Sequence, residues 1–337
     1  MPTRLVSPSS LLRYVVCTGL LFSQGAFANP LPAGCDLGEQ PSLPLTFTDD
    51  LRPVGHATIN GAAVPVMLST GAAESLVLNR KTLDRLGIAV RTSTSKMSAD
   101  DGERNPLGVD IVRDISHALL QEFSFGAAKV NNATYMVEDF MDDTFGARIG
   151  AGTLLQTDLE IALDAGYIKP FKPNGCFRAH LAYWDPQAVS VLAWHDPWKR
   201  EPRFVFSVRI AGKDLRALLS TATPYSYLPR ATAERLGLTP GSPGATREAP
   251  VPGHDADKPV WKVPVPAMSI GALEVKELDL RVIDLPHSGE LLVLGADFLH
   301  RHRIYIATSQ KQIYFSPIAS PRILKRGSVE VIPQIID

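Results

Sequence analysis

The chain has 337 residues, of which 45% are apolar and 20% are charged, and its formal net charge is −1. This composition is ordinary for a globular protein with one large or two modest domains and a buried core. No basic run exceeds a few residues, so the electrostatic footprint of a nucleic-acid-binding protein is missing and we exclude nucleic acid as a partner.

The first residues have the pattern of an export signal. Two arginines precede or flank a short apolar run over 14–22, and Ala26 and Ala28 frame a small-x-small cleavage site. The run is well short of the roughly 20 apolar residues that a membrane-spanning helix needs. We therefore predict a signal peptide over 1–28 and an exported chain, periplasmic or secreted, with no integral membrane segment after cleavage. A membrane anchor is the alternative.

Three cysteines become two if Cys17 leaves with the signal peptide. The remaining pair, Cys35 and Cys176, is even in number and predicts a disulfide in an oxidising compartment. Two buried free thiols are the alternative, since the sequence does not place the two residues within bonding distance.

The first half reads as short strands, turns and one short helix. Residues 43–47 form a candidate edge strand, and the runs 57–60 and 64–68 flank Gly61 as a predicted hairpin. We expect a strand over 75–78, a helical stretch over 81–86 that ends at Gly87, a hairpin within 123–137, and a closing strand pair over 160–163 and 167–171.

The second half repeats this order at a nearly constant offset. The matching residues are Ile59, Gly61 and Ser69 with Ile210, Gly212 and Ser220 at 151, Arg85 and Gly87 with Arg235 and Gly237 at 150, and Ile149 and Gly150 with Leu294 and Gly295 at 145. This regularity predicts a duplication. We divide the chain into the signal (1–28), a first lobe (36–180), a connector (181–202), a second lobe (203–316) and a tail (317–337). The connector's tryptophans predict packing between the lobes.

Two motifs accompany the duplication. An apolar strand runs into Ser69-Thr70-Gly71 in the first half and into Ser220-Thr221-Ala222 in the second, and the second half also contains Leu292-Val293-Leu294-Gly295-Ala296-Asp297-Phe298-Leu299. Arg148 interrupts the corresponding apolar run of the first half. This pattern resembles the retropepsin-like aspartic proteases, in the bacterial exported form with two units in one chain. The resemblance covers about residues 43–316.

The resemblance implies an all-β, bilobal acid-protease fold of the pepsin and retropepsin type, with two duplicated barrel-like lobes and short helices. In that family each lobe donates one aspartate from an Asp-Thr-Gly turn, and the two carboxylates share a proton. Ser69 and Ser220 stand at both places, and a serine hydroxyl does not ionise near neutral pH. We expect no intact catalytic site at Ser69, Thr70, Gly71, Ser220, Thr221 and Ala222. In the family the threonines brace the turns, and Ala222 replaces a glycine, which suggests a different backbone there.

Other polar residues are candidates for the binding cleft. If Ile59 pairs with Val64, His56 opposes Met67 and shares a face with Ser69, which makes it a candidate residue of the cleft. Asp100, Asp101 and Gly102 form a turn signal at the position of the family's flap. A polar rim residue is the alternative for His56.

The remaining acidic and histidine residues indicate no further chemistry. We interpret Asp297 and Asp164 as structural, and His300 and His302 as solvated residues after a helix. The eight histidines have no metal-ligand spacing, so neither a metal nor a cofactor is expected.

Three functions are compatible with these observations. The first is a pseudo-peptidase that binds a peptide or protein in the cleft between the lobes, the second an active aspartic-type endopeptidase by descent, and the third a structural protein of the cell envelope. The fold alone does not choose among them. Neither the ligand nor the oligomeric state follows from the sequence.

Overall fold

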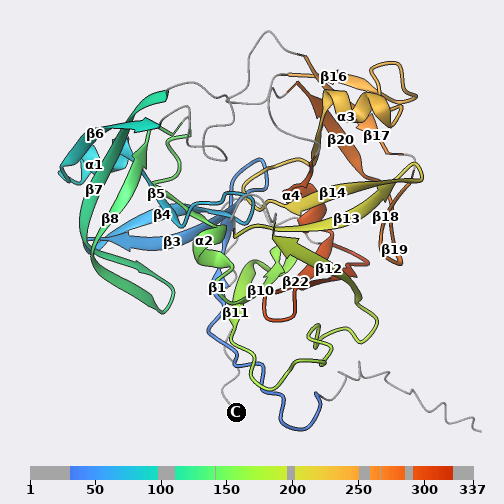
Figure 1. Cartoon of the computed structure of the whole chain (residues 1–337), viewed down its shortest axis with the longest axis horizontal. Coiled ribbons are helices and arrows are strands. Elements are labelled where there is room, and N and C mark those ends of the chain that lie inside the picture. Colours follow the sequence, from blue (N-terminus) through green and yellow to red (C-terminus); the bar gives the residue numbers. More distant parts are fainter. Residues whose placement is uncertain are drawn as a thin grey trace, which may run out of the picture.

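A computed structural model describes residues 31–97, 111–140, 142–195, 202–249, 259–265, 267–284 and 291–321. In this part of the chain two lobes built of β-strands lie beside each other, joined below by further strands (Figure 1). The predicted all-β, bilobal acid-protease fold is confirmed. The expected signal peptide over 1–28 lies outside the described residues, as does most of the tail.

The first lobe is an eight-stranded sheet with the order β2-β3-β4-β9-β5-β8-β7-β6. Its strands are β2 (Thr46–Phe47), β3 (Pro53–Ile59), β4 (Ala62–Ser69), β5 (Leu76–Asn79), β6 (Val90–Met97), β7 (Ile111–Phe125), β8 (Ala128–Glu138) and β9 (Ala147–Gly150). Two short helices accompany them, α1 (Arg80–Arg85) and α2 (Ala151–Leu154). The side chain of Asn79 caps α1, and Gly87, with a φ of 67°, follows its end as predicted.

The second lobe repeats the pairing pattern of the first. Its elements are β13 (Phe204–Ile210), β14 (Lys213–Leu219), β15 (Tyr227–Pro229), α3 (Arg230–Arg235), β16 (Thr246–Glu248), β17 (Val260–Pro264), β18 (Met268–Ile270), β19 (Leu273–Val275), β20 (Asp279–Ile283), β21 (Leu292–Leu294) and α4 (Ala296–Leu299). In the first lobe β9 lies parallel to β4, which leads to Ser69, and antiparallel to β5. In the second lobe β21 likewise lies parallel to β14, which leads to Ser220, and antiparallel to β15. This repetition supports the predicted duplication.

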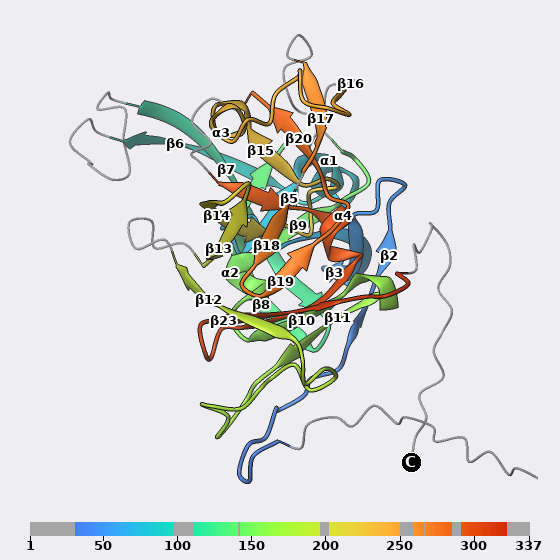
Figure 2. The ribbon, with the colours of Figure 1, turned by 90° about the vertical axis from the view of Figure 1, so that its right-hand side faces the viewer.

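A third group of strands connects the lobes, in the order β1-β11-β10-β22-β23-β12 (Figure 2). These are β1 (Leu43–Pro44), β10 (Asp158–Ala162), β11 (Tyr167–Phe171), β12 (Val189–His195), β22 (His302–Ala307) and β23 (Gln312–Pro317), with the 3-10 turn η2 (Leu163–Ala165) between β10 and β11. Strand β10 of the first half pairs with β22 of the second, with Leu159 opposite Ile306. The chain ends of the two halves therefore share one sheet.

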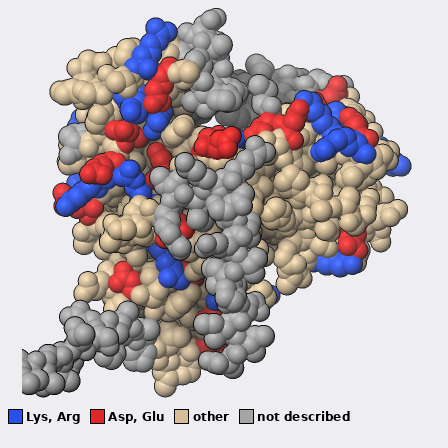
Figure 3. Space-filling model, turned by 180° about the vertical axis from the view of Figure 1, so that it is seen from behind, with Lys and Arg blue, Asp and Glu red and all other residues tan. Residues whose placement is uncertain are grey.

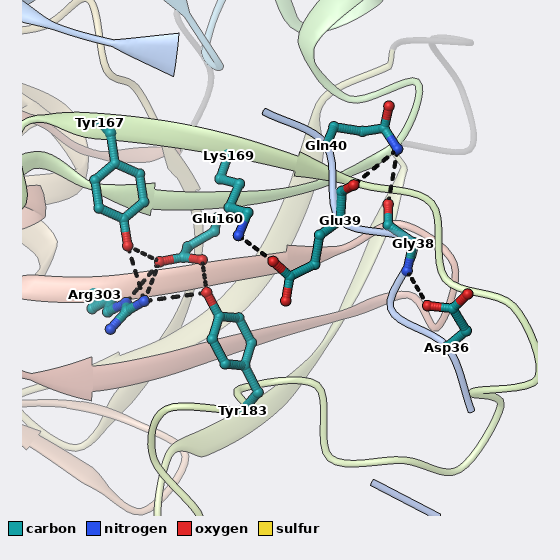
Figure 4. Close-up of polar contacts among 9 residues, drawn as sticks. All are labelled: Asp36, Gly38, Glu39, Gln40, Glu160, Tyr167, Lys169, Tyr183 and Arg303. Carbon is teal, nitrogen blue, oxygen red and sulfur yellow. Dashed lines mark hydrogen bonds and ion pairs between the residues drawn. The ribbon is translucent and has the colours of Figure 1, made fainter. Parts of the chain in front are cut away.

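A buried ion pair lies within these connecting strands (Figure 4). The fully buried carboxylate of Glu160 on β10 accepts hydrogen bonds from Arg303 Nε at 2.7 Å and from the hydroxyls of Tyr167 and Tyr183 at 2.8 Å each. The Arg303 guanidinium also lies 4.1 Å from the ring centroid of Trp184. Burial, followed by the negative charge of Glu160, raises the pKa of both tyrosines, which stay protonated donors.

The predicted disulfide between Cys35 and Cys176 is confirmed. It closes a separation of 141 residues and fixes the extended lead-in to the segment after β11. Around it lies a small apolar cluster that includes Leu37, Phe171 and Leu181. Trp184 of the connector packs against this cluster and donates a hydrogen bond to Ser316 at 3.1 Å.

Two predictions about local structure were wrong. Ile59 pairs with Ala62 and not with Val64, because Asn60 and Gly61, with φ values of 49° and 84°, make a tight two-residue turn. His300 and His302 are not solvated, since their exposed fractions are 3% and 6%. His300 Nε2 bonds to the carbonyl of Leu51 at 3.1 Å, and His302 Nδ1 bonds to the carbonyl of Phe298 at 2.9 Å.

The surface carries both signs of charge. On the face seen in Figure 3, basic and acidic side chains lie beside one another on both sides of the molecule. Among the described residues, no helix is long and apolar enough to cross a bilayer.

The disulfide should contribute strongly to stability. For a loop of this length, chain-entropy arguments give an upper value of about 5 kcal/mol. We expect the paired variant Cys35→Ser with Cys176→Ser to unfold at a clearly lower urea concentration than the oxidised protein, and reduction of the wild-type protein to reproduce most of the difference. Equal midpoints for the oxidised and reduced proteins would contradict a structural role for the bond.

The two buried histidines should make stability depend on pH. Burial lowers the pKa of both His300 and His302 from the usual 6.5. Just below pH 6.5 the unfolded chain therefore binds more protons at these histidines than the folded chain does. Their contribution to stability is complete above pH 6.5 and is lost as the pH falls below it. Urea titrations at about pH 7.5 and pH 5.5 should show this loss. The loss should shrink in His302→Gln, whereas His56→Gln, which removes an exposed imidazole, is the matched control.

Candidate functional site

The two serines of the duplicated motif stand at the ends of equivalent strands. Ser69 is the last residue of β4 and Ser220 follows β14, and their exposed fractions are 3% and 5%. Ser69 Oγ accepts a hydrogen bond from the amide of Ala72 at 3.0 Å, and Ser220 Oγ lies 2.7 Å from Thr223 Oγ1. Each hydroxyl is thus held by the residue three positions further along its own turn.

The threonines of the motif join the two turns across the lobe junction. Thr70 Oγ1 donates to the carbonyl of Leu219 at 2.8 Å, and Thr221 Oγ1 donates to the carbonyl of Leu68 at 2.5 Å. In return, each hydroxyl accepts from the backbone amide of the other threonine, at 3.2 and 3.3 Å. All these atoms are buried, so the four bonds fix the serine-bearing turns against each other.

The turns approach so closely that the third motif position matters. A Cβ atom on Gly71 would lie 2.7 Å from both Cβ and Oγ of Ser220, which no real side chain tolerates. Neither Gly71 nor Ala222 has a positive φ, so alanine at the second turn does not force a strained backbone. Ala222 lines open space instead.

Beside the serines lies a hollow of about 320 Å³, a size that suits a small ligand or a side chain of a peptide. Both lobes contribute to its wall. The lining residues are Met67, Ser69, Gly71, Ala72, Arg148, Arg203, Leu218, Ser220, Ala222, Thr223, Tyr227, Leu291 and Val293.

A larger hollow of about 490 Å³ lies beside α4, near His300 and Pro317. With the exception of Leu51, its lining residues belong to the second half of the chain. We place the candidate site at the smaller hollow because the duplicated turns meet there and both lobes form its wall.

The other predicted residues of the cleft lie elsewhere or outside the described residues. His56 is exposed and opposes Pro65, not Met67, which puts it four residues along β4 from Ser69, or about 13 Å. It is absent from the lining of the hollow. Asp100, Asp101 and Gly102 fall outside the described residues, between the paired strands β6 and β7.

Asp297 is held as a structural residue behind the second turn. Its carboxylate accepts from the amide and hydroxyl of Ser226, at 2.9 and 2.7 Å, and from the amide of Phe298 at 2.8 Å. Burial raises the pKa of this carboxyl group, although the hydrogen bonds and Arg281 act in the opposite direction. Asp164 lies in the turn η2, as interpreted from the sequence.

The sequence analysis missed two polar residues of the hollow. Arg203 directly precedes β13, and its Nη1 donates to the carbonyl of Gly71 in the other lobe at 3.2 Å. Tyr227 begins β15 and faces the same space. Only the offset of 151 that relates Arg203 to Arg52 could have drawn attention to it, and Arg52 binds Asp50 and Asp142 instead.

The described lining of the site can donate hydrogen bonds but includes no carboxylate or imidazole. None of the described lining residues is His, Asp or Glu, so a serine hydroxyl has no general base in the hollow. In the described part of the chain, no group of three or more His, Cys, Asp and Glu residues could hold a metal ion.

Comparison with known protein families gave a match in the second half of the chain. Residues 206–298 match a family described as aspartyl protease. A search among curated proteins found no match. The matched range runs from β13 through Ser220 to Phe298 in α4, and it supports a retropepsin-like, aspartyl-protease-like domain in the second lobe.

Proposed function

We propose that the protein is an exported aspartic-protease-like protein that has lost acid–base catalysis and binds an extended peptide or protein segment between its lobes. One observation carries the proposal. The four hydrogen bonds that brace Thr70 against Thr221 are intact, while serine occupies both positions at which the resembled family has aspartate. The hydrogen bonds that shape the cleft are therefore present, and the two carboxylates that would act as acid and base are not.

The loss of catalysis follows from the properties of the hydroxyl groups. Two carboxylates that share a proton supply both a base and an acid for an attacking water. A serine hydroxyl supplies neither, and the hydroxyls of Ser69 and Ser220 are already bound within their own turns. A nucleophilic serine would need a base within hydrogen-bond reach, and the described lining contains none.

Binding is supported by the strands at the open edges of the two sheets. Strand β6 ends the strand order of the first lobe and β16 that of the second, and both lie in the upper half of the view, on opposite sides (Figure 1). An edge strand presents backbone amides and carbonyls to which an extended peptide can add. This mode of binding needs no carboxylate from the protein.

Export is supported by the disulfide, because such bonds persist in oxidising compartments. The leader pattern over 1–28 points the same way. Periplasm and extracellular medium both fit, and fractionation of the expressed full-length chain would separate them.

The wild-type protein should not hydrolyse unfolded protein substrates as an aspartic protease does. We expect no pepstatin-sensitive cleavage from acid to neutral pH, since general acid and general base assistance are each worth roughly 10²- to 10⁴-fold. Ser69→Asp alone should be inactive, because one carboxylate has no partner with which to share a proton. Even Ser69→Asp with Ser220→Asp should be weak, since Arg203 would hold the carboxylates ionised, and adding Arg203→Gln should raise the activity.

Peptide release is measured by mass spectrometry of a denatured, carboxymethylated substrate. The proposed loss of catalysis would be wrong if the wild-type chain showed pepstatin-sensitive cleavage that disappears on mutation of Ser69 or Ser220.

Peptide binding should depend on the free space beside Ala222. The test uses labelled ten-residue peptides, selected on an array and titrated by fluorescence anisotropy. Ala222→Trp fills the hollow and should weaken binding at least tenfold, which corresponds to about 1.4 kcal/mol. Leu192→Trp adds the same ring at an exposed position of β12 and should leave the affinity unchanged. Equal affinities for both variants would remove the hollow from the binding site.

A further inference from the structure

An arginine interrupts the apolar strand behind the first turn. Arg148 on β9 pairs in register with Met67, and its counterpart in the second lobe, Val293, pairs with Leu218. All four side chains line the hollow, so the duplicated strands differ there by one guanidinium group. The equivalent position of the second lobe is filled by valine. Packing alone therefore does not explain the positive charge of Arg148.

Arg148 is held by carboxylates without exhausting its donors. Its Nη2 lies 3.2 Å from Glu138 and 3.8 Å from Glu74. Its Nε has no hydrogen-bond partner within the described part of the chain. A guanidinium offers five N–H donors, so contact with Glu138 leaves capacity for a second acceptor.

A second arginine enters the same hollow from the other lobe. The bond from Arg203 Nη1 to the carbonyl of Gly71 anchors this guanidinium at the first turn, and Gly71 is in close contact with Ser220. Arg203 also acts on Tyr227: burial raises the pKa of this tyrosine, and the positive charge of Arg203 opposes the rise. The guanidinium therefore lies in the wall of the hollow, in contact with Gly71.

The described lining therefore combines two cations with four hydroxyl groups and contains no carboxylate. The hydroxyls belong to Ser69, Ser220, Thr223 and Tyr227. Ser220 and Thr223 share one hydrogen bond, so only one hydroxyl of that pair can donate to an anion. Ser69, Tyr227 and the two guanidinium groups can donate as well. Guanidinium groups match the planar, two-oxygen geometry of a carboxylate better than any other side chain does.

Resting on the peptide-binding function proposed above, the geometry points to a peptide ligand that places a carboxylate in the hollow lined by Arg148 and Arg203. The carboxylate is either an Asp or Glu side chain or the C-terminus of the ligand. Both sources present the same chemistry to the two arginines, and the experiment separates them.

The test compares matched peptides on the full mature chain by fluorescence anisotropy. Peptides blocked at both ends, with Glu or Gln at one central position, test the side-chain source. The Gln peptide with a free or an amidated C-terminus tests the terminal source. We expect one charged member to bind at least tenfold more tightly than its neutral partner, the size typical of hydrogen bonds to charged groups. The preference should diminish as salt rises from about 0.01 M to about 1 M.

Variants assign the preference to the hollow. Arg148→Val, which copies Val293, and Arg203→Gln should each reduce the preference severalfold, while Glu138→Gln, which removes a competing carboxylate, should increase it. Arg209→Gln removes an exposed guanidinium of β13 that pairs with Asp214, and it should have no effect. Circular dichroism of each variant checks that it is folded.

The outcomes separate the two proposals. If peptides bind the wild-type chain but charged and neutral partners bind equally, the carboxylate inference is overturned and the peptide-binding function stands. If Glu138→Gln weakens the preference, or Arg209→Gln abolishes it, the preference arises elsewhere and the inference is again overturned. If no peptide of either kind binds, the proposed function fails and the inference fails with it.

Discussion

The reciprocal hydrogen bonds between Thr70 and Thr221 are the constraint on which the site depends. Each bond joins a buried group of one lobe to a buried group of the other. If the lobes separated without admitting water, four backbone groups and two hydroxyls would lose their partners, at a cost of about 1–3 kcal/mol for each unsatisfied group. The turns, and with them both serines, must therefore keep one geometry.

A second attachment lies below the turns and is of a different kind. Strands β10 and β22 pair across the two halves, and the Glu160 to Arg303 ion pair is buried within that pairing. An isolated buried ion pair gives weak evidence for net stability, but here the tyrosine hydroxyls of the network satisfy the carboxylate as well. Two separate attachments therefore hold the lobes in one arrangement around the hollow, which lowers the ordering cost of binding a ligand there.

The regular offsets predicted a duplication, and the resemblance of the duplicated turn motif to the retropepsin-like family implied the fold. The disulfide was predicted because two cysteines remain once Cys17 leaves with the signal peptide. Predictions from local sequence were wrong where tertiary contacts determine whether a residue is buried. His300 and His302 follow a short helix and look solvated, but Phe47 and Phe298 pack against their rings. The contact of Arg203 with Gly71 and that of Glu160 with Arg303 could not be predicted from local patterns, since in each the partners lie more than 100 residues apart.

The position of Arg203 is compatible with serines at 69 and 220 but would disturb a pair of catalytic carboxylates there. A pair of catalytic carboxylates works by sharing a proton, and a guanidinium beside them would favour the doubly ionised state. Arg203, bound to the carbonyl of Gly71, stands where it would do this. With serine at both positions, the proposed function leaves the cation no carboxylate pair to ionise, and the described lining offers hydrogen-bond donors. Two substitutions at Ser69 and Ser220 would thus restore the composition of the resembled site without restoring its electrostatics.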